Sequence, residues 1–312
     1  MKKPIVIFVI GPTASGKTGL AVKLAKYFSS AVISADSMQI YKGMHIASAA
    51  PDEGEMQGVP HKMLEFLDYG EAFTVADYAD AARKEIDNLL SAGKIPVIAG
   101  GTGLYINALA DNIRFLPAKT DLSIRHELEE EYDSAGGEEM LRRLAAFDSQ
   151  AADKLNPADR RRIIRAFEIY KTSGMTKSKQ NEQSKSDPPP FNPVMIGLNF
   201  TDRDLLYDRI NRRVDEMIRK GLIDEARAAF DTNIKKGAAQ AIGHKEFFAH
   251  FRGEQTLKEA TEALKQSTRR YAKRQLTWFN KDSRINWIYV DKTEDVFDAA
   301  LKIIKEEETK NA

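Results

Sequence analysis

The sequence contains no cysteine among its 312 residues. Disulfide bridges, thiolate metal sites and a cysteine nucleophile are therefore excluded. The chain also has no apolar run long enough to cross a bilayer, so we expect no membrane partner. The apolar stretch near the N-terminus, IVIFVI, leads into a glycine-rich loop and lacks a signal-peptide cleavage site, which favours a cytoplasmic protein.

Net charge is nearly absent as well, since 47 basic residues face 46 acidic ones and leave a formal charge of +1. Composition alone thus gives no sign of a nucleic-acid partner. The basic residues are clustered, however, in DRRRIIR (159–165), RINRRVDEMIRK (209–220) and TRRYAKRQLTWFNK (268–281). Any one of these runs fits a solvated helix face as well as it fits an anion-binding surface. Three such runs in a chain that also contains a glycine-rich phosphate-binding loop favour a large anionic partner.

That loop is GPTASGKT, residues 11–18, which follows IVIFVI and precedes the helix-like LAVKLAKYF. Its two glycines allow backbone angles at which successive N–H groups turn inward, and the following helix adds its positive dipole end. Lys17 supplies a mobile positive charge, and the Thr18 hydroxyl is suited to ligate a phosphate-bound Mg²⁺. The pattern predicts a diphosphate or polyphosphate site formed by Gly11, Pro12, Thr13, Ala14, Ser15, Gly16, Lys17 and Thr18.

Short β-branched runs alternate with helical patterns along the chain. IVIFVI, AVISA (31–35) and IPVIA (95–99) come early, and VMIGLNF (194–200) and INWIYV (285–290) come late. Between them the sequence has no strand signal but shows helical spacing up to Gly174. We expect an α/β fold with a P-loop NTPase-like parallel sheet in the core, 1–116 and 194–312, and an inserted all-helical domain at 117–193. The polar and then proline-rich SKQNEQSKSDPPPFNP (178–193) should be a mobile return linker.

Ligands of open α/β sheets bind beyond the carboxyl ends of the strands. Two turns of this chain are therefore candidates for the binding site. Asp36 and Ser37 follow the second strand, and AGGTGLY (99–105) follows the third. Asp36 fits three roles, as a Mg²⁺ ligand, a general base or the cap of a following helix. The glycine turn has no acidic residue where a nucleotide hydrolase would hold its Mg²⁺-binding Asp. Its glycines suggest the close approach of a flat group, so ordinary ATP hydrolysis is disfavoured.

Several motifs follow one another over nearly the whole chain: GPTASGKT, DSMQIY, VPHKMLEF, GKIPVIAGGTGLYI, DRRRIIRAFEIYKTSG, QAIGHKEF and TRRYAKRQLTWF. In this order and approximate spacing, the sequence resembles the tRNA dimethylallyltransferases. The phosphate-binding loop alone would also fit many kinases. The number of separate motifs makes the resemblance specific.

The resemblance implies transfer of a dimethylallyl group from dimethylallyl diphosphate to N6 of the adenosine next to the tRNA anticodon on its 3′ side. The loop would then hold a diphosphate leaving group instead of ATP. Asp36 would be the general base, Thr13 and Lys17 would stabilise the departing diphosphate, and Thr18 would bind Mg²⁺. A base is useful here because the lone pair of an exocyclic adenine amine is delocalised into the ring, which makes it a poor nucleophile.

The same motif positions imply further contacts. Ser37, Met38 and Gln39 would line the adenosine pocket, and Thr102 would touch the tRNA backbone or the base, which must be extruded from its loop. Arg209 and Arg213 lie one helical turn apart and would bind the same diphosphate oxygens, the alternative being a solvated helix face. The tRNA-binding set is Asp36, Ser37, Met38, Gln39, Thr102, Arg125, Arg161, Arg162, Arg165, Gln240, Gly243, His244 and Lys245.

Three departures from the family pattern stand out. IASAAP (46–51) replaces the usual IGTAKP and loses a glycine and a lysine, Lys62 replaces the second histidine of VPHH, and His244 replaces a tyrosine. They concern tRNA contacts more than diphosphate chemistry. We interpret His244 as a polar replacement instead of a catalytic acid, because no carboxylate in the local sequence is placed to orient it.

Two other functions compete with this hypothesis. A small-molecule or nucleoside kinase would use DRRRIIR as an arginine-rich lid over ATP. A nucleotide-switched RNA-binding protein would use the loop only to sense ATP or GTP, and the lack of an N-K-x-D motif argues against a GTP switch. We expect a monomeric enzyme with Mg²⁺, tRNA and dimethylallyl diphosphate as its partners.

Overall fold

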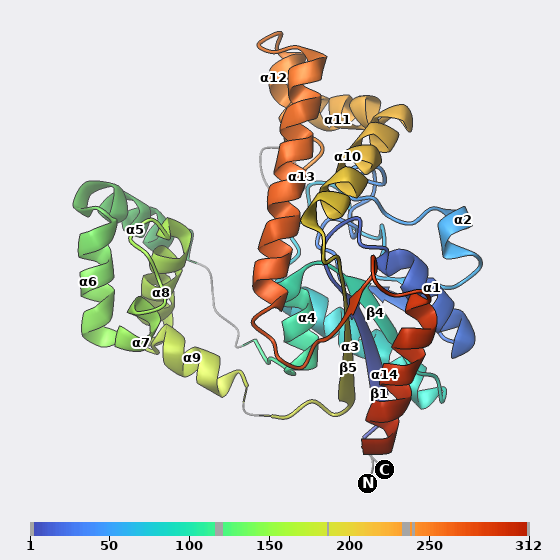
Figure 1. Ribbon diagram of the computed structural model, residues 1–312. Helices are drawn as coiled ribbons and strands as arrows, with labels where there is room; N and C mark the ends of the chain where they lie inside the picture. The colour runs from blue at the N-terminus through green and yellow to red at the C-terminus, as the bar shows by residue number, and fades with distance from the viewer. Residues whose placement is uncertain (1–2, 116–120, 186, 233–237, 239–240, 311–312) are drawn as a thin grey trace. The chain divides into compact units, whose positions relative to one another are not determined.

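The computed structural model describes residues 3–115, 121–185, 187–232, 238 and 241–310. The chain divides into two compact units (Figure 1). The core unit comprises Met1–Ala110 with Pro189–Ala312, and the helical unit comprises Asp111–Pro188.

The core unit contains one parallel sheet. Within the described residues its strand order is β3-β2-β4-β1-β5-β6, and every neighbouring pair is parallel. The predicted α/β fold with a parallel sheet is confirmed, and the very short β3 is an addition to it. The strands are β1 (Ile5–Ile10), β2 (Val32–Ser34), β3 (His61–Lys62), β4 (Val97–Gly100), β5 (Asn192–Asn199) and β6 (Asn286–Tyr289).

Helices cover both faces of this sheet. Alternate side chains of β1, namely Ile5, Ile7 and Val9, join a buried cluster with side chains of α1 (Lys17–Tyr27) and α14 (Val296–Lys310). These two helices lie side by side in front of the strands in Figure 1, while α3 (Val75–Ser91) and α4 (Gly103–Ala110) pack together on the other face. Because β1 is buried along its whole length, the loop that follows it has a fixed starting point.

Further helices stand beyond the carboxyl ends of the strands. The longest is α13 (Leu257–Phe279), which packs against α10 (Arg203–Arg219) and also contacts α4 (Figure 1). A Thr256 capping box fixes its first turn. The described part of the core unit also contains α2 (Glu53–Met56), α11 (Leu222–Asp231), the 3₁₀ helix η2 (Lys245–Phe247) and α12 (Phe248–Phe251).

The helical unit has its own apolar core, to which Leu128, Met140, Leu144 and Ile163 contribute. Hydrogen bonds from Asn112 Nδ2 to the carbonyls of Asp187 and Pro188 join the start of the unit to its end. The unit covers Asp111–Pro188, whereas the sequence predicted 117–193. Its helices are α5 (Leu122–Ala135), α6 (Gly137–Phe147), α7 (Ser149–Ala152), α8 (Arg160–Ser173) and α9 (Lys177–Gln183).

Helix α9 corrects one prediction, because it occupies the first part of the segment expected to be a mobile linker. The Thr176 side chain accepts a hydrogen bond from the Lys179 N–H and so caps the helix. Asp148, the N-cap of α7, accepts a second bond from the Ser178 N–H at 2.9 Å. These contacts outweigh the polar composition that suggested a linker.

No helix among the described residues is both long enough and apolar enough to cross a membrane.

Candidate active site

The loop of residues 11–18 connects β1 to α1. Gly11 has a φ of 140°, and a Cβ there would lie 2.4 Å from the Leu198 carbonyl oxygen of β5, so only glycine fits. Gly16 is the N-cap of α1 with a φ of 97°, and no side chain caps this helix. The first N–H groups of α1 therefore remain for an anion, as a phosphate-binding loop requires.

Lys17 lies at the start of α1, half-buried in the site. Its Nζ donates to the Pro12 carbonyl at 2.7 Å, so the ammonium is held over its own loop. Burial, with the nearby Arg213 guanidinium as a second cause, lowers the pKa of Lys17 to about 7, and the Asp36 carboxylate opposes this shift. An arriving anion would favour the charged form, since opposite charges at short range stabilise each other.

Asp36 lies directly beyond β2 and lines the same cavity as Lys17. Its Oδ1 accepts the Met38 N–H at 2.9 Å in a tight turn, and no helix starts there, so the helix-cap interpretation is wrong. Burial raises the pKa of Asp36, while the Met38 N–H and Lys17 act in the opposite direction. A half-buried carboxylate with a raised pKa suits a general base.

A cavity of about 350 Å³, here called the inner cavity, opens beside these two groups. Its lining includes Lys17, Thr18, Asp36 and Arg213. Apolar side chains from α10, α13 and the segment before η2 line it as well. Those apolar side chains are Ile210, Val214, Met217, Ile242 and Leu264. The inner cavity thus joins an anion site to a space suited to a short hydrocarbon.

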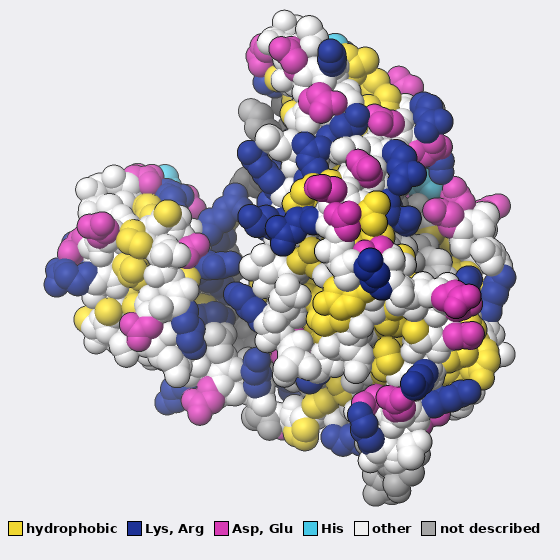
Figure 2. All heavy atoms as spheres, viewed as in Figure 1, with side chains coloured by type: hydrophobic (Ala, Val, Ile, Leu, Met, Phe, Trp, Pro, Cys, Tyr) yellow, Lys and Arg dark blue, Asp and Glu magenta, His cyan; other side chains and the backbone are white. Residues whose placement is uncertain are grey.

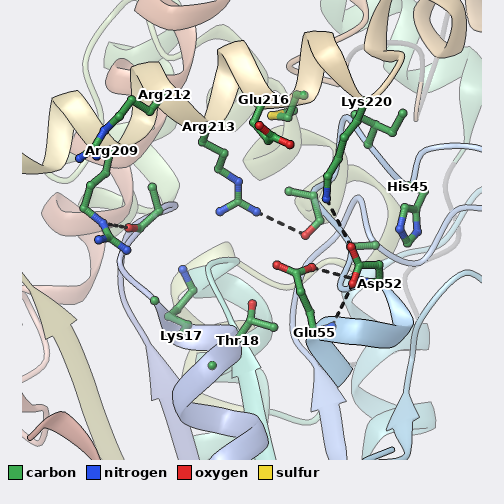
Figure 3. Close-up of a pocket in the computed structure, with 17 residues that line it drawn as sticks. Lys17, Thr18, His45, Asp52, Glu55, Arg209, Arg212, Arg213, Glu216 and Lys220 are labelled. Atoms are coloured by element: carbon green, nitrogen blue, oxygen red, sulfur yellow. Dashed lines mark hydrogen bonds and ion pairs between the residues drawn. The ribbon is translucent and has the colours of Figure 1, made fainter. Parts of the chain in front are cut away.

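A second cavity of about 450 Å³, the outer cavity, shares Lys17, Thr18 and Arg213 with the first (Figure 3). Arg209 and Arg213 project from α10 toward the loop in Figure 3. Arg209 Nε donates to the Ala14 carbonyl at 2.9 Å, and Arg213 Nη2 to the Ala49 carbonyl at 3.4 Å. Both arginines therefore contact loops of the site and are more than a solvated helix face.

The donor chemistry near Thr18 fits Mg²⁺. Its hydroxyl, the carboxylate of Asp36 in the inner cavity and that of Glu55 in the outer cavity are hard oxygen donors. Among the described residues no group of three or more acidic or histidine side chains forms a ready cation site. Mg²⁺ is commonly held by few protein ligands together with substrate phosphates, so Thr18 would share it with a bound diphosphate.

The glycine turn after β4 packs closely against α13. A Cβ at Gly101 would lie 2.0 Å from Gln275 Nε2, and one at Gly103 would lie 2.3 Å from the Trp278 ring. The Trp278 ring thus packs on Gly103, while Gly100 and Gly101 line the inner cavity. Thr102 Oγ1 accepts the Ser37 N–H at 3.0 Å, which connects the turn to the loop that carries Asp36.

The predicted tRNA contacts near η2 divide into exposed and buried residues. Lys245 is exposed and lines the inner cavity, whereas His244 is fully buried and presents no surface to an RNA. Gly243 has a φ of 109°, and a Cβ there would approach Ala47 at 3.0 Å. Gln240 lies outside the described residues.

A carboxylate does orient His244, contrary to the prediction from the local sequence. His244 Nε2 lies 2.9 Å from Glu225 Oε1. The same Glu225 carboxylate accepts the N–H groups of Ile46 and Ala47 at 2.7 and 2.9 Å. Two departures from the family pattern, IASAAP and His244, thus meet at one glutamate. The third, Lys62, forms a surface ion pair with Glu85 at 3.6 Å.

The arginines assigned to tRNA lie on α5 and α8 of the helical unit. Arg165 donates to the fully buried carboxylate of Glu168 at 2.8 Å, and Arg125 lies 4.0 Å from the same group. Arg161 and Arg162 are exposed, and Arg162 lies 3.8 Å from Asp159. Figure 2 shows Lys and Arg side chains interspersed with Asp and Glu over this unit. Arg161 and Arg162 are therefore the members of the set most open to a phosphate.

The sequence did not predict the residues of α13 that line the inner cavity, among them Tyr271, Arg274 and Gln275. Burial raises the pKa of the Tyr271 phenol, so this side chain is neutral. Gln275 is one of five buried residues of α13, and the other four are apolar. A single amide on an otherwise apolar helix face was the signal that could have identified it.

Comparison with known proteins agrees with this geometry. Residues 39–282 match the family model described as IPP transferase. The chain belongs to this family. It is 45% identical over 302 residues to the tRNA dimethylallyltransferase of Acetivibrio thermocellus, covering 96% of this chain and 95% of the relative. The tRNA dimethylallyltransferase of Bacillus subtilis is 45% identical over 287 residues, which is 92% of this chain and 90% of the relative.

Solved structures give the same family. The full-length tRNA isopentenylpyrophosphate transferase from Bacillus halodurans superposes with a TM-score of 0.72 at 41% identity, covering 99% of this chain and 97% of that one. A eukaryotic dimethylallyltransferase acting on tRNA superposes with a TM-score of 0.82 at 27% identity, covering 99% of this chain and 80% of that one. The resemblance read from the motifs is confirmed, and a prenyltransferase is supported over the kinase alternative.

Proposed function

We propose that this protein is a tRNA dimethylallyltransferase that moves the dimethylallyl group of dimethylallyl diphosphate onto N6 of the adenosine next to the anticodon on its 3′ side. The products are N6-(dimethylallyl)adenosine and diphosphate, and the enzyme acts as a cytoplasmic monomer. The observation that supports this best is the inner cavity, whose lining combines the phosphate-binding loop, a carboxylate with a raised pKa and several apolar side chains.

In the proposed reaction one bond forms and one breaks. N6 attacks C1 of the dimethylallyl group, the C1–O bond to diphosphate breaks, and the N6 proton passes to Asp36. The uncapped N–H groups of α1, with Lys17 and Arg213, would stabilise the charge that develops on the leaving diphosphate. A bound Mg²⁺ would neutralise part of that charge. The apolar side chains that line the inner cavity would contact the five-carbon tail.

The adenosine must leave its stacked position to reach Asp36, which costs a few kcal/mol. Contacts to the tRNA backbone have to offset this cost. The exposed Arg161 and Arg162 of the helical unit and Lys245 at the inner cavity are suited to supply them.

The test is transfer without ATP. Purified protein, tRNA, Mg²⁺ and labelled dimethylallyl diphosphate should give labelled tRNA adenosine and one equivalent of diphosphate per modification. Isopentenyl diphosphate is the matched control, because its diphosphate is not on an allylic carbon and should not be displaced. No transfer in the absence of ATP, or ADP formation when ATP is added, would instead point to a kinase.

A further inference from the structure

The buried amide of Gln275 connects two loops of the site. Its side chain is 5% exposed on α13. Oε1 accepts the Thr13 N–H of the phosphate-binding loop at 2.9 Å, and Nε2 donates to the Gly101 carbonyl of the glycine turn at 3.0 Å. A buried amide is costly unless both its ends are hydrogen-bonded. Here both partners belong to loops that surround the inner cavity.

The glycine turn is built around this amide. A Cβ at Gly101 would lie 2.0 Å from Gln275 Nε2, so no other residue leaves room for the hydrogen bond. The next residue, Thr102, accepts the Ser37 N–H, and Ser37 follows Asp36. Hydrogen bonds from Gln275 thus reach the diphosphate loop directly and the Asp36 loop through the turn.

One consequence concerns Thr13, which was assigned to stabilise the departing diphosphate. Because its N–H donates to Gln275, that N–H is already committed before any anion arrives. Thr13 would then act on the diphosphate through its hydroxyl, and the conformation of the loop would be set in advance. Donors fixed before the reaction stabilise developing charge without reorganisation.

We propose that Gln275 is a positioning residue, which holds the diphosphate loop and the Asp36 loop at the separation that transfer requires. The proposal rests on the proposed function. Misplacement of reacting groups by about 1 Å can cost about 10²-fold in rate, so loss of both bonds should lower kcat by about 10–100-fold. The KM for dimethylallyl diphosphate should rise less, because most N–H groups of the loop remain.

Two variants test the hydrogen bonds themselves. Gln275→Met keeps the length of the side chain and removes both bonds, so kcat should be low at every pH. Gln275→Glu can accept from Thr13 and donate to Gly101 only while it is protonated, and burial favours that neutral form. The kcat of Gln275→Glu relative to wild type should therefore rise several-fold as pH falls from 8 to about 5.5. Dividing the kcat of Gln275→Glu by that of wild type at each pH cancels the effect of ionisations that both proteins share.

Gln255→Met is the matched control. Gln255 Nε2 donates to the Glu246 carbonyl at 2.8 Å, which lies in neither site loop, so this variant should keep its kcat. Thermal unfolding of all variants verifies that they are folded at the assay temperature. Wild-type kcat in folded Gln275→Met, or a low kcat in Gln275→Glu that pH does not restore, would overturn the proposal.

Binding of inorganic diphosphate separates this proposal from the proposed function. Calorimetric titration needs no transfer reaction, and Gln275→Met should bind diphosphate several-fold more weakly than wild type, with Gln255→Met unchanged. A wild-type protein that binds diphosphate but transfers nothing would contradict the proposed function alone. Equal affinity in Gln275→Met and wild type would contradict the role of Gln275.

Discussion

The basic side chains of the core unit and those of the helical unit lie in different surroundings. Lys17 and Arg213 line cavities, and burial lowers the pKa of both. Arg161 and Arg162 are exposed on α8, and Arg165 is bonded to the buried Glu168. Charges with little solvent around them act strongly on a nearby reacting group, whereas exposed charges are screened by salt. The core unit is therefore suited to chemistry and the helical unit to salt-dependent affinity.

The largest expected effect tests the chemical side of this comparison. Asp36→Asn keeps the oxygen that accepts the Met38 N–H but cannot take a proton, so kcat should fall about 10²–10⁴-fold with tRNA affinity nearly intact. Single-turnover transfer and tRNA titration measure the two quantities. Asp68→Asn, at an exposed carboxylate paired with Lys42, is the control. Near-normal turnover would remove Asp36 from the mechanism.

Lys17→Met should have the next largest effect. It removes the mobile charge beside the leaving diphosphate, and loss of one such donor typically lowers kcat about 10²–10³-fold. Lys23→Met, at an exposed position on the same helix, makes the same chemical change away from the cavities. If both variants lowered kcat equally, general destabilisation of α1 would explain the loss.

The lowered pKa of Lys17 predicts a pH dependence of binding. Below about pH 7 the ammonium is already present, whereas above it the anion must bind together with a proton. Affinity for dimethylallyl diphosphate should therefore fall by up to about tenfold per pH unit between pH 7 and 9. Calorimetric titrations of wild type and Lys17→Met measure this, because their difference cancels the ionisation of the ligand. Parallel pH profiles in the two proteins would contradict the assignment.

The buried Glu168 predicts a difference in stability within the helical unit. Arg165→Ala leaves its carboxylate with only the more distant Arg125, so unfolding free energy should fall by about 1–3 kcal/mol. Arg162→Ala, at a side chain 66% exposed, should change it by less than about 0.5 kcal/mol. Urea unfolding of both variants measures this difference. Equal losses of unfolding free energy would mean that Arg165 does not stabilise the buried Glu168 carboxylate.

The parts of the site that depend on local chain geometry could be predicted from sequence. Gly11, Gly16, Lys17 and Thr18 form one strand-loop-helix unit, whose spacing alone brings them together between β1 and α1. Asp36 was found because carboxyl ends of parallel strands meet at one edge of the sheet. Alternating β-branched runs predicted that sheet for the same local reason.

The parts of the site that depend on segments distant in the sequence could not be predicted. Gln275 meets Thr13 across 262 positions and Gly101 across 174, and no local pattern encodes such pairs. The carboxylate of Glu225 beside His244 was missed for the same reason. Helix α9 formed where composition suggested a linker, since the decisive bond from Ser178 ends on Asp148, 30 positions away.

The smallest expected effect tests the affinity side of the comparison. Each lost phosphate contact reduces the salt slope of binding by about 0.7–0.9, so the pair Arg161→Gln and Arg162→Gln should reduce it by about 1–2. Arg165 stays in place, which keeps the Glu168 pair and the fold of the unit. Diphosphate affinity should not change, because that site lies in the core unit.

A second pair of the same charge makes this last test specific. Arg142 and Arg143 lie on α6 of the same unit and both bond to Glu139, so they are less available to phosphates. Arg142→Gln with Arg143→Gln should therefore reduce the slope less than the α8 pair does. Filter binding of tRNA between 50 and 200 mM salt measures all slopes. Equal slopes for the α8 variant and wild type would place the tRNA phosphates on another surface, whereas equal reductions by both pairs would mean that the unit attracts tRNA only through its overall charge.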